Sequence, residues 1–101
     1  MNSIANAPQA DKAEETVENM RKRLRFRAWH RGTREMDILV GRFADAHVEA
    51  FDRPQLQQFE AMLTCNDPDV YDWYIGAKPV PPEDDSTVIQ LFLSFKIISE
   101  Q

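Results

Sequence analysis

Glycine and cysteine are both scarce in this sequence. Its 101 residues contain three glycines and a single cysteine, Cys65. Few glycines disfavour a β-rich fold, because tight hairpin turns need residues that accept a positive φ. One cysteine cannot form an internal disulfide, and it cannot build a cysteine-based zinc site alone. The sequence therefore predicts a helical protein without internal disulfides, in a reducing compartment.

Long apolar runs and targeting segments are also lacking. No apolar run approaches the ~20 residues that a membrane-spanning helix needs. The N-terminal region has no apolar signal core, and its acids are untypical of an acid-poor transit peptide: Asp11, Glu14, Glu15 and Glu18. We expect a cytoplasmic protein with no direct membrane insertion. The missing presequence favours a bacterial source over a mitochondrial precursor.

The overall composition is that of an ordinary globular domain. Hydrophobic residues make up 43% and charged residues 29% of the chain. This length supports one domain with one core, so we do not expect a deep active site enclosed by its own walls. Residues 1–12 are polar and without periodicity, which predicts a flexible N-terminal tail. Residues 13–98 are expected to form the single domain.

Apolar residues recur at helical spacing in the first half of that domain. The first expected helix buries Val17, Met20, Leu24 and Ala28, and it ends near residues 29–31 with Gly32 as a left-handed stop. The second expected helix begins at about Thr33, a possible N-cap, and ends before Asp52. Its apolar face consists of Met36, Leu39, Val40, Phe43, His47 and Ala50.

Aspartate and proline mark the helix starts of the second half. A third helix is expected to follow Asp52 or Arg53, with Pro54 near its first position, and to bury Leu56, Phe59, Met62 and Leu63. A fourth is expected to be capped by Asp67, opened by Pro68 and closed by Gly76, with Val70, Trp73 and Tyr74 facing inward.

The last apolar run follows a proline-rich connector. Residues 78–82 predict a stiff, extended connector, and residues 84–86 predict a cap for a last helix with Val88, Ile89, Leu91, Phe92 and Phe95 on its apolar face. That run could form a strand in isolation, but no other segment offers it a partner strand. The expected fold class is therefore all-α, a small antiparallel bundle of about five short helices.

Charge is unevenly spread along the chain. The net charge is −5, yet seven basic residues and no acid lie between Arg21 and Arg34. Such a block could dock onto an acidic partner. Because Phe26 and Trp29 are interleaved with it, a helical nucleic-acid-binding module is the alternative hypothesis. The strongly acidic remainder of the chain would repel a phosphate backbone.

The sequence offers no arrangement typical of a catalytic or metal site. His30 and His47 are isolated, so we expect no metal site. No Cys–His or Ser–His–Asp arrangement and no glycine-rich loop after a strand is evident, and we do not expect an enzyme. Other chemically suggestive residues have simpler roles: Asp67 and Asp69 at a helix start, Trp73 and Tyr74 in the core, and Cys65 buried at a helix end.

Two segments carry a resemblance to a known family. Residues 31–37, R-G-T-R-E-M-D, resemble the RGxxE motif of the flavinator family, the succinate dehydrogenase assembly factors, through Arg31, Gly32 and Glu35, with Arg34 between them. Residues 63–76, L-T-C-N-D-P-D-V-Y-D-W-Y-I-G, resemble that family's apolar pair, D-x-D turn and tryptophan shortly before a glycine. The resemblance spans about residues 21–95.

The resemblance implies a fold and a function. It implies a bundle of five helices that binds the flavoprotein subunit of succinate dehydrogenase, and sometimes fumarate reductase, and promotes covalent attachment of FAD to a histidine of that subunit. FAD would then be bound by the client flavoprotein, and this chain would bind no cofactor tightly. The factor is expected to act as a monomeric chaperone. The implied partner-binding residues are His30, Arg31, Gly32, Arg34, Glu35 and Asp37.

Taken without the resemblance, two of these residues have simpler explanations. Gly32 would be a plain helix C-cap. Glu35 would be an acid favoured by the helix dipole, or an i,i+4 partner of Arg31. The resemblance instead implies that Glu35 orients a histidine or pairs with an arginine of the client.

Overall fold

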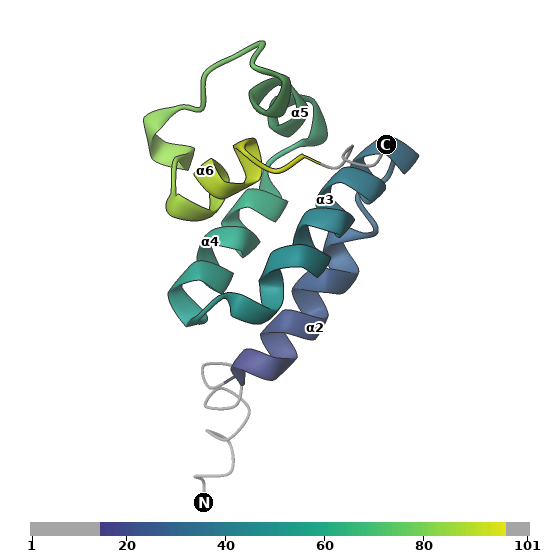
Figure 1. Cartoon of the computed structure of the whole chain (residues 1–101), viewed down its shortest axis with the longest axis vertical. Coiled ribbons are helices and arrows are strands. Elements are labelled where there is room, and N and C mark those ends of the chain that lie inside the picture. Colours follow the sequence, from purple (N-terminus) through teal and green to yellow (C-terminus); the bar gives the residue numbers. More distant parts are fainter. Residues whose placement is uncertain (1–14, 97–101) are drawn as a thin grey trace, which may run out of the picture.

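The computed structural model of this chain describes residues 15–96, in which every regular element is helical (Figure 1). The five α-helices of this part are α2 (Val17–Ala28), α3 (Arg34–His47), α4 (Arg53–Thr64), α5 (Asp67–Ile75) and α6 (Thr87–Leu93). Two 3₁₀ turns, η1 (Val48–Ala50) and η2 (Pro82–Asp84), follow α3 and precede α6. The predicted all-α bundle is confirmed. The predicted tail, residues 1–12, lies outside the described residues, and the domain limits 13–98 stay a prediction.

Side-chain caps explain where the helices begin. The capping side chains are Thr16, Thr33, Asp52, Asn66 and Ser86. The predicted cap Thr33 is confirmed. Of the two residues expected to precede the third helix, Asp52 is its N-cap and forms a reciprocal capping box with Gln55, while Arg53 is the first helical residue. The prediction that Asp67 caps α5 is wrong. Asn66, one residue earlier, accepts the Asp69 amide at 3.0 Å, and Asp67 is the first helical residue.

The two positive-φ glycines of the structure lie in different settings. Gly76 closes α5 in the left-handed conformation at φ +80°, as predicted. Gly32 does not end α2, because the helix stops at Ala28 and the Trp29 amide already donates to the last-turn carbonyls. Gly32 lies beyond that end at φ +132°, in the turn that leads into α3. Its predicted role as the helix stop is therefore wrong.

The helices pack around one aromatic core. Helix α2 packs on α3 and α4, and α6 packs on α4 and α5 (Figure 1). Phe43 of α3 is fully buried, and its ring centroid lies 5.7 Å from that of Phe59 on α4 and 5.3 Å from that of Phe92 on α6. One core thus joins three helices, as expected for a chain of this length.

The helical periodicity located most of this core, but it did not predict the buried Ala44, Val48 and Phe51, and two residues that it placed on apolar faces are exposed. Ala50 is exposed because it lies in η1, whose three-residue turn breaks the α-helical face of α3. Leu91 is 37% exposed on α6. Trp73 is buried and Tyr74 is half-buried, where its hydroxyl donates to the Phe95 carbonyl at 2.5 Å.

The last segment is a helix, as predicted, although its β-branched and aromatic residues would also suit a strand. Ser86 caps α6, and Gln58 of α4 accepts the Val88 amide at 3.1 Å. The connector before it is extended at Pro81, but Pro82–Asp84 form a 3₁₀ turn that the prolines did not predict. None of the helices in residues 15–96 has the length and apolar character to cross a membrane.

Candidate functional site

The turn between α2 and α3 holds most of the residues singled out from the sequence. Thr33 caps α3 by accepting the Met36 amide at 3.3 Å, which places Glu35 in the first turn of that helix. The carboxylate of Asp37 accepts the backbone amides of Arg31 at 2.5 Å and Gly32 at 3.1 Å. Asp37 therefore holds the turn against the helix that follows it, and it is half-buried.

The side chain of Arg31 leaves this turn and crosses to the junction of α4 and α5. It pairs with Asp67 at 2.7 Å and donates to the carbonyl oxygens of Leu63 and Cys65. Its side chain is 9% exposed. Arg31 pairs with Asp67 and not with Glu35, so the i,i+4 explanation for Glu35 is wrong.

Four of the predicted partner-binding residues are exposed on the outside of this turn: His30, Gly32, Arg34 and Glu35. The imidazole of His30 stacks on Phe26 with ring centroids 4.0 Å apart, and its Nδ1 lies 2.7 Å from the Phe26 carbonyl oxygen. Neither Arg34 nor Glu35 forms an ion pair with another residue of the described range. Their charges are available to a second molecule.

An open groove lies beside the turn, between the start of α3 and the start of α5. It has a volume of about 510 Å³ and is lined by Thr33, Glu35, Met36, Asp67, Pro68 and Tyr71. Its surface is mostly apolar, and the Tyr71 ring is 46% exposed. We name this feature the α3–α5 groove. The sequence did not predict this groove, because Met36 and Tyr71 are 35 positions apart and only the fold brings them together. The one available indication was that the groove residues belong to the two segments that resemble the family.

The basic block is largely neutralised inside the molecule. Its salt bridges to acids, between 2.7 and 3.7 Å long, are Arg21–Glu18, Arg23–Glu15, Arg23–Glu60, Arg25–Asp45, Arg25–Glu49, Arg27–Glu60 and Arg31–Asp67. A nucleic-acid phosphate would have to displace these carboxylates. The pairing therefore argues against the nucleic-acid alternative.

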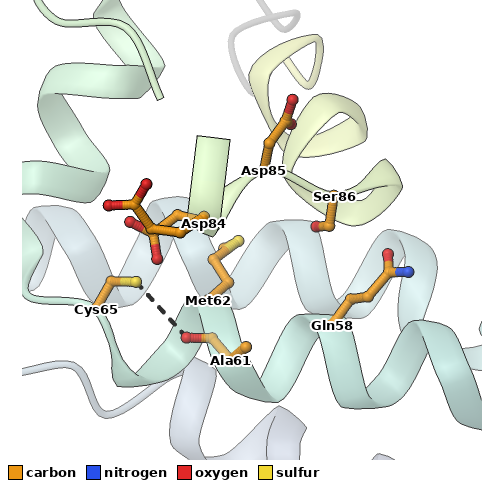
Figure 2. A pocket seen from close by; sticks show the side chains of 8 residues that line it. Gln58, Ala61, Met62, Cys65, Asp84, Asp85 and Ser86 are labelled. Carbon is orange, nitrogen blue, oxygen red and sulfur yellow. Dashed lines mark hydrogen bonds between the residues drawn. The ribbon is translucent and has the colours of Figure 1, made fainter. Parts of the chain in front are cut away.

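A second hollow lies between α4 and the segment that precedes α6, and Figure 2 shows Cys65 at one end of it. It has a volume of about 170 Å³. Cys65 is half-buried, less than predicted, and its thiol donates to the Ala61 carbonyl at 3.6 Å. Burial, and then the charge of Asp84, raise the pKa of the Cys65 thiol. A thiol kept protonated is a poor nucleophile and a poor metal ligand.

The described part of the chain contains no cluster of side chains that could bind a metal ion. Across residues 15–96, no three histidine, cysteine, aspartate or glutamate side chains come close enough to hold an ion. Fold and site together define a small helical-bundle protein whose motif residues surround an exposed turn beside an apolar groove.

Comparison with known proteins identifies the family to which this helical-bundle protein belongs. The sequence profile of the family described as flavinator of succinate dehydrogenase matches residues 22–96. The match covers all five described helices except the start of α2. The chain belongs to this family.

Individual relatives are found in bacteria and in mitochondria. The chain is 38% identical over 78 residues to the FAD assembly factor SdhE of Acetobacter pasteurianus, a match that covers 77% of this chain and 72% of that protein. It is 32% identical to the mitochondrial succinate dehydrogenase assembly factor 2 of Dictyostelium discoideum, over 74% of this chain and 53% of the relative. It is also 32% identical to assembly factor 2-A of Drosophila mojavensis, over 77% and 51%. The chain thus spans about half the length of these mitochondrial relatives.

Proposed function

We propose that this chain is an assembly factor that binds the flavoprotein subunit of succinate dehydrogenase and promotes covalent attachment of FAD to it. The observation that carries the proposal is the family match over residues 22–96, together with a bacterial relative named FAD assembly factor. Fumarate reductase is a second expected client. We keep the cytoplasm as the expected compartment and a monomer as the expected state.

The proposed partner-binding surface is the outside of the α2–α3 turn together with the α3–α5 groove. His30, Gly32, Arg34 and Glu35 are exposed there, and Tyr71 extends the surface onto α5. A Cβ at Gly32 would meet no atom within 4 Å, so intramolecular crowding does not explain this glycine. Its φ of +132° and the space beside it suit a turn that a partner's backbone approaches closely.

The proposed role is organisation of the client, without catalysis by this chain. Glu35 presents a carboxylate that can orient a histidine or pair with an arginine of the client. Holding the flavin and its acceptor histidine in a reactive geometry lowers the barrier without a catalytic base from the factor. In this proposal FAD stays with the client, and the factor binds no cofactor tightly.

The test is covalent flavin on the succinate dehydrogenase flavoprotein subunit, measured by in-gel fluorescence in cells with and without this chain. We expect the signal to be lost without the chain and restored by wild type but not by Gly32→Glu or Glu35→Arg. Glu83→Arg is the matched control, because Glu83 is exposed, forms no ion pair within residues 15–96 and lies in η2, outside the turn and the α3–α5 groove. We expect it to restore the signal.

Two results would contradict the proposal. An unchanged flavin signal in cells that lack the chain would remove the function. Loss of helical circular dichroism in Gly32→Glu or Glu35→Arg would show that the motif supports the fold, and the interface assignment would then be wrong.

A further inference from the structure

Arg31 differs from the other arginine of its motif in where its side chain goes. Arg34 is exposed, whereas the guanidinium of Arg31 is enclosed between the α2–α3 turn and the α4–α5 junction. Nε donates to the Asp67 carboxylate at 2.8 Å, and Nη2 donates to the Cys65 carbonyl at 2.7 Å. Nη1 donates to the Leu63 carbonyl at 2.5 Å. All three donor nitrogens are therefore engaged inside the molecule.

The acceptors of Arg31 belong to one structural junction. Leu63 lies in the last turn of α4, whose final carbonyls lack helical partners, and Cys65 is the C-cap. Asp67 is the first residue of α5. The planar guanidinium of Arg31 thus donates hydrogen bonds to carbonyl oxygens at the end of α4 and pairs with the Asp67 carboxylate at the start of α5. A lysine could supply only a point charge at this place.

The backbone of Arg31 is hydrogen-bonded to α3, away from the junction that its side chain contacts. Its amide and that of Gly32 donate to Asp37 on α3. Arg31 therefore connects α3, through the turn, to the α4–α5 junction. These are the same two regions that form the walls of the α3–α5 groove, with Glu35 on one side and Asp67 and Tyr71 on the other.

We infer that Arg31 and Asp67 form an internal clamp that sets the spacing of the α3–α5 groove, and that Arg31 acts as a positioning residue without touching the partner. Contact with a partner would require Arg31 to give up buried, charge-assisted hydrogen bonds, which leaves several polar groups without partners. This inference rests on the proposed function only in naming the partner. It also assigns Asp67 a role that neither its acidity nor its place at a helix start revealed.

The test compares four single variants of the full chain and the double variant Arg31→Met/Asp67→Ala. Arg31→Met and Asp67→Ala remove the two halves of the clamp. Arg34→Met and Asp69→Ala are matched controls, an exposed arginine of the same motif and an acid of the same helix turn. Amide hydrogen exchange of residues 30–37 is measured in the isolated protein, and association and dissociation rates are measured with the purified flavoprotein subunit.

We expect both clamp variants to accelerate exchange of the turn amides by about tenfold, the effect of losing one charge-assisted hydrogen bond. They should weaken binding mainly through faster dissociation. The double variant should bind no more weakly than the worse single variant, because the two side chains act as one unit. Neither control should change exchange in the turn. If Arg31→Met does not fold, Arg31→Lys and Asp67→Ala carry the same comparison.

Three outcomes would overturn the clamp. If Arg31→Met weakens binding while exchange in the turn stays unchanged, and its effect is independent of Asp67→Ala, then Arg31 contacts the partner directly. If exchange rises but binding is unaffected, the clamp does not position the groove. Failure of the wild-type chain to bind the subunit would instead contradict the proposed function, and unchanged turn exchange in both clamp variants would still overturn the clamp.

Discussion

Arg23 shows how a single residue can gather charges from distant parts of the chain. Its guanidinium contacts Glu15, which precedes α2, at 2.8 Å, and Glu60 on α4 at 2.7 Å. The hydrogen bond from Arg23 holds the pKa of the Glu15 carboxyl below its ordinary value of 4.5. A carboxylate whose pKa is lower in the folded state stabilises that state above the unfolded pKa. This stabilisation is lost as the pH falls through the folded pKa.

We predict that Glu15→Gln lowers the free energy of unfolding at pH 7 by about 0.5 kcal/mol, the usual size for an ion pair at the protein surface, because both half-buried side chains remain in contact with water. The difference from wild type should disappear in acid, once Glu15 is protonated in both states. Urea unfolding at a series of pH values measures this. Glu83→Gln, an exposed acid without an ion pair in residues 15–96, should match wild type throughout. A difference at Glu15 that persists in strong acid would contradict the pairing.

Between elements, Gly41 determines how closely α3 approaches the end of α2. Gly41 is buried, and a Cβ built on it would lie 2.7 Å from Cε3 of the Trp29 ring and closer still to two further ring atoms. The indole N–H of Trp29 donates to Asp45 at 3.3 Å, which holds the ring over the helix. The missing side chain of Gly41 makes room for the ring. The sequence pattern alone does not reveal this role of Gly41.

We predict that Gly41→Ala destabilises the protein, although alanine at an exposed helix position stabilises by about 1 kcal/mol relative to glycine. Overpacking against Trp29 should cost about 1–3 kcal/mol. The melting temperature should therefore fall. In a Trp29→Leu background the same change should be neutral or stabilising. An increase in melting temperature of Gly41→Ala alone would show that the ring moves aside without cost.

The molecule as a whole depends on one aromatic centre. Phe43 is fully buried, and its ring lies within 6.3 Å, centroid to centroid, of rings from four other segments: Phe51, Phe59, Phe92 and Phe95. These rings come from α4, from α6 and from the segments that follow η1 and α6. A change at Phe43 therefore affects most of the bundle at once.

We predict that Phe43→Ala lowers the free energy of unfolding by about 3–5 kcal/mol, from lost burial and the cavity left behind. That is a large share of the roughly 5–15 kcal/mol that stabilises a typical domain. Phe26→Ala is the matched control, because Phe26 is 63% exposed and should change stability by no more than about 0.5 kcal/mol. Urea unfolding monitored by circular dichroism measures both. Equal losses at the two positions would contradict the burial pattern.

Local rules were sufficient to predict most of the fold. Helical spacing located the core residues, and capping residues located the starts of α3, α4 and α6, because both depend on contacts between residues a few positions apart. The same rules failed where neighbours compete. Asn66 and Asp67 are both good caps; in the structure Asn66 caps α5, and the Asp67 carboxylate pairs with Arg31, which is 36 positions away.

What the sequence by itself determined is the all-α class, the order of the helices and the two family-like segments, because short-range periodicity and residue identity carry this information. The tertiary structure alone decided that Arg31 is turned inward while Arg34 and Glu35 stay exposed, and that Met36 and Tyr71 line one groove. Hydrogen bonds and groove walls join residues by distance in space, and a linear pattern does not record that distance.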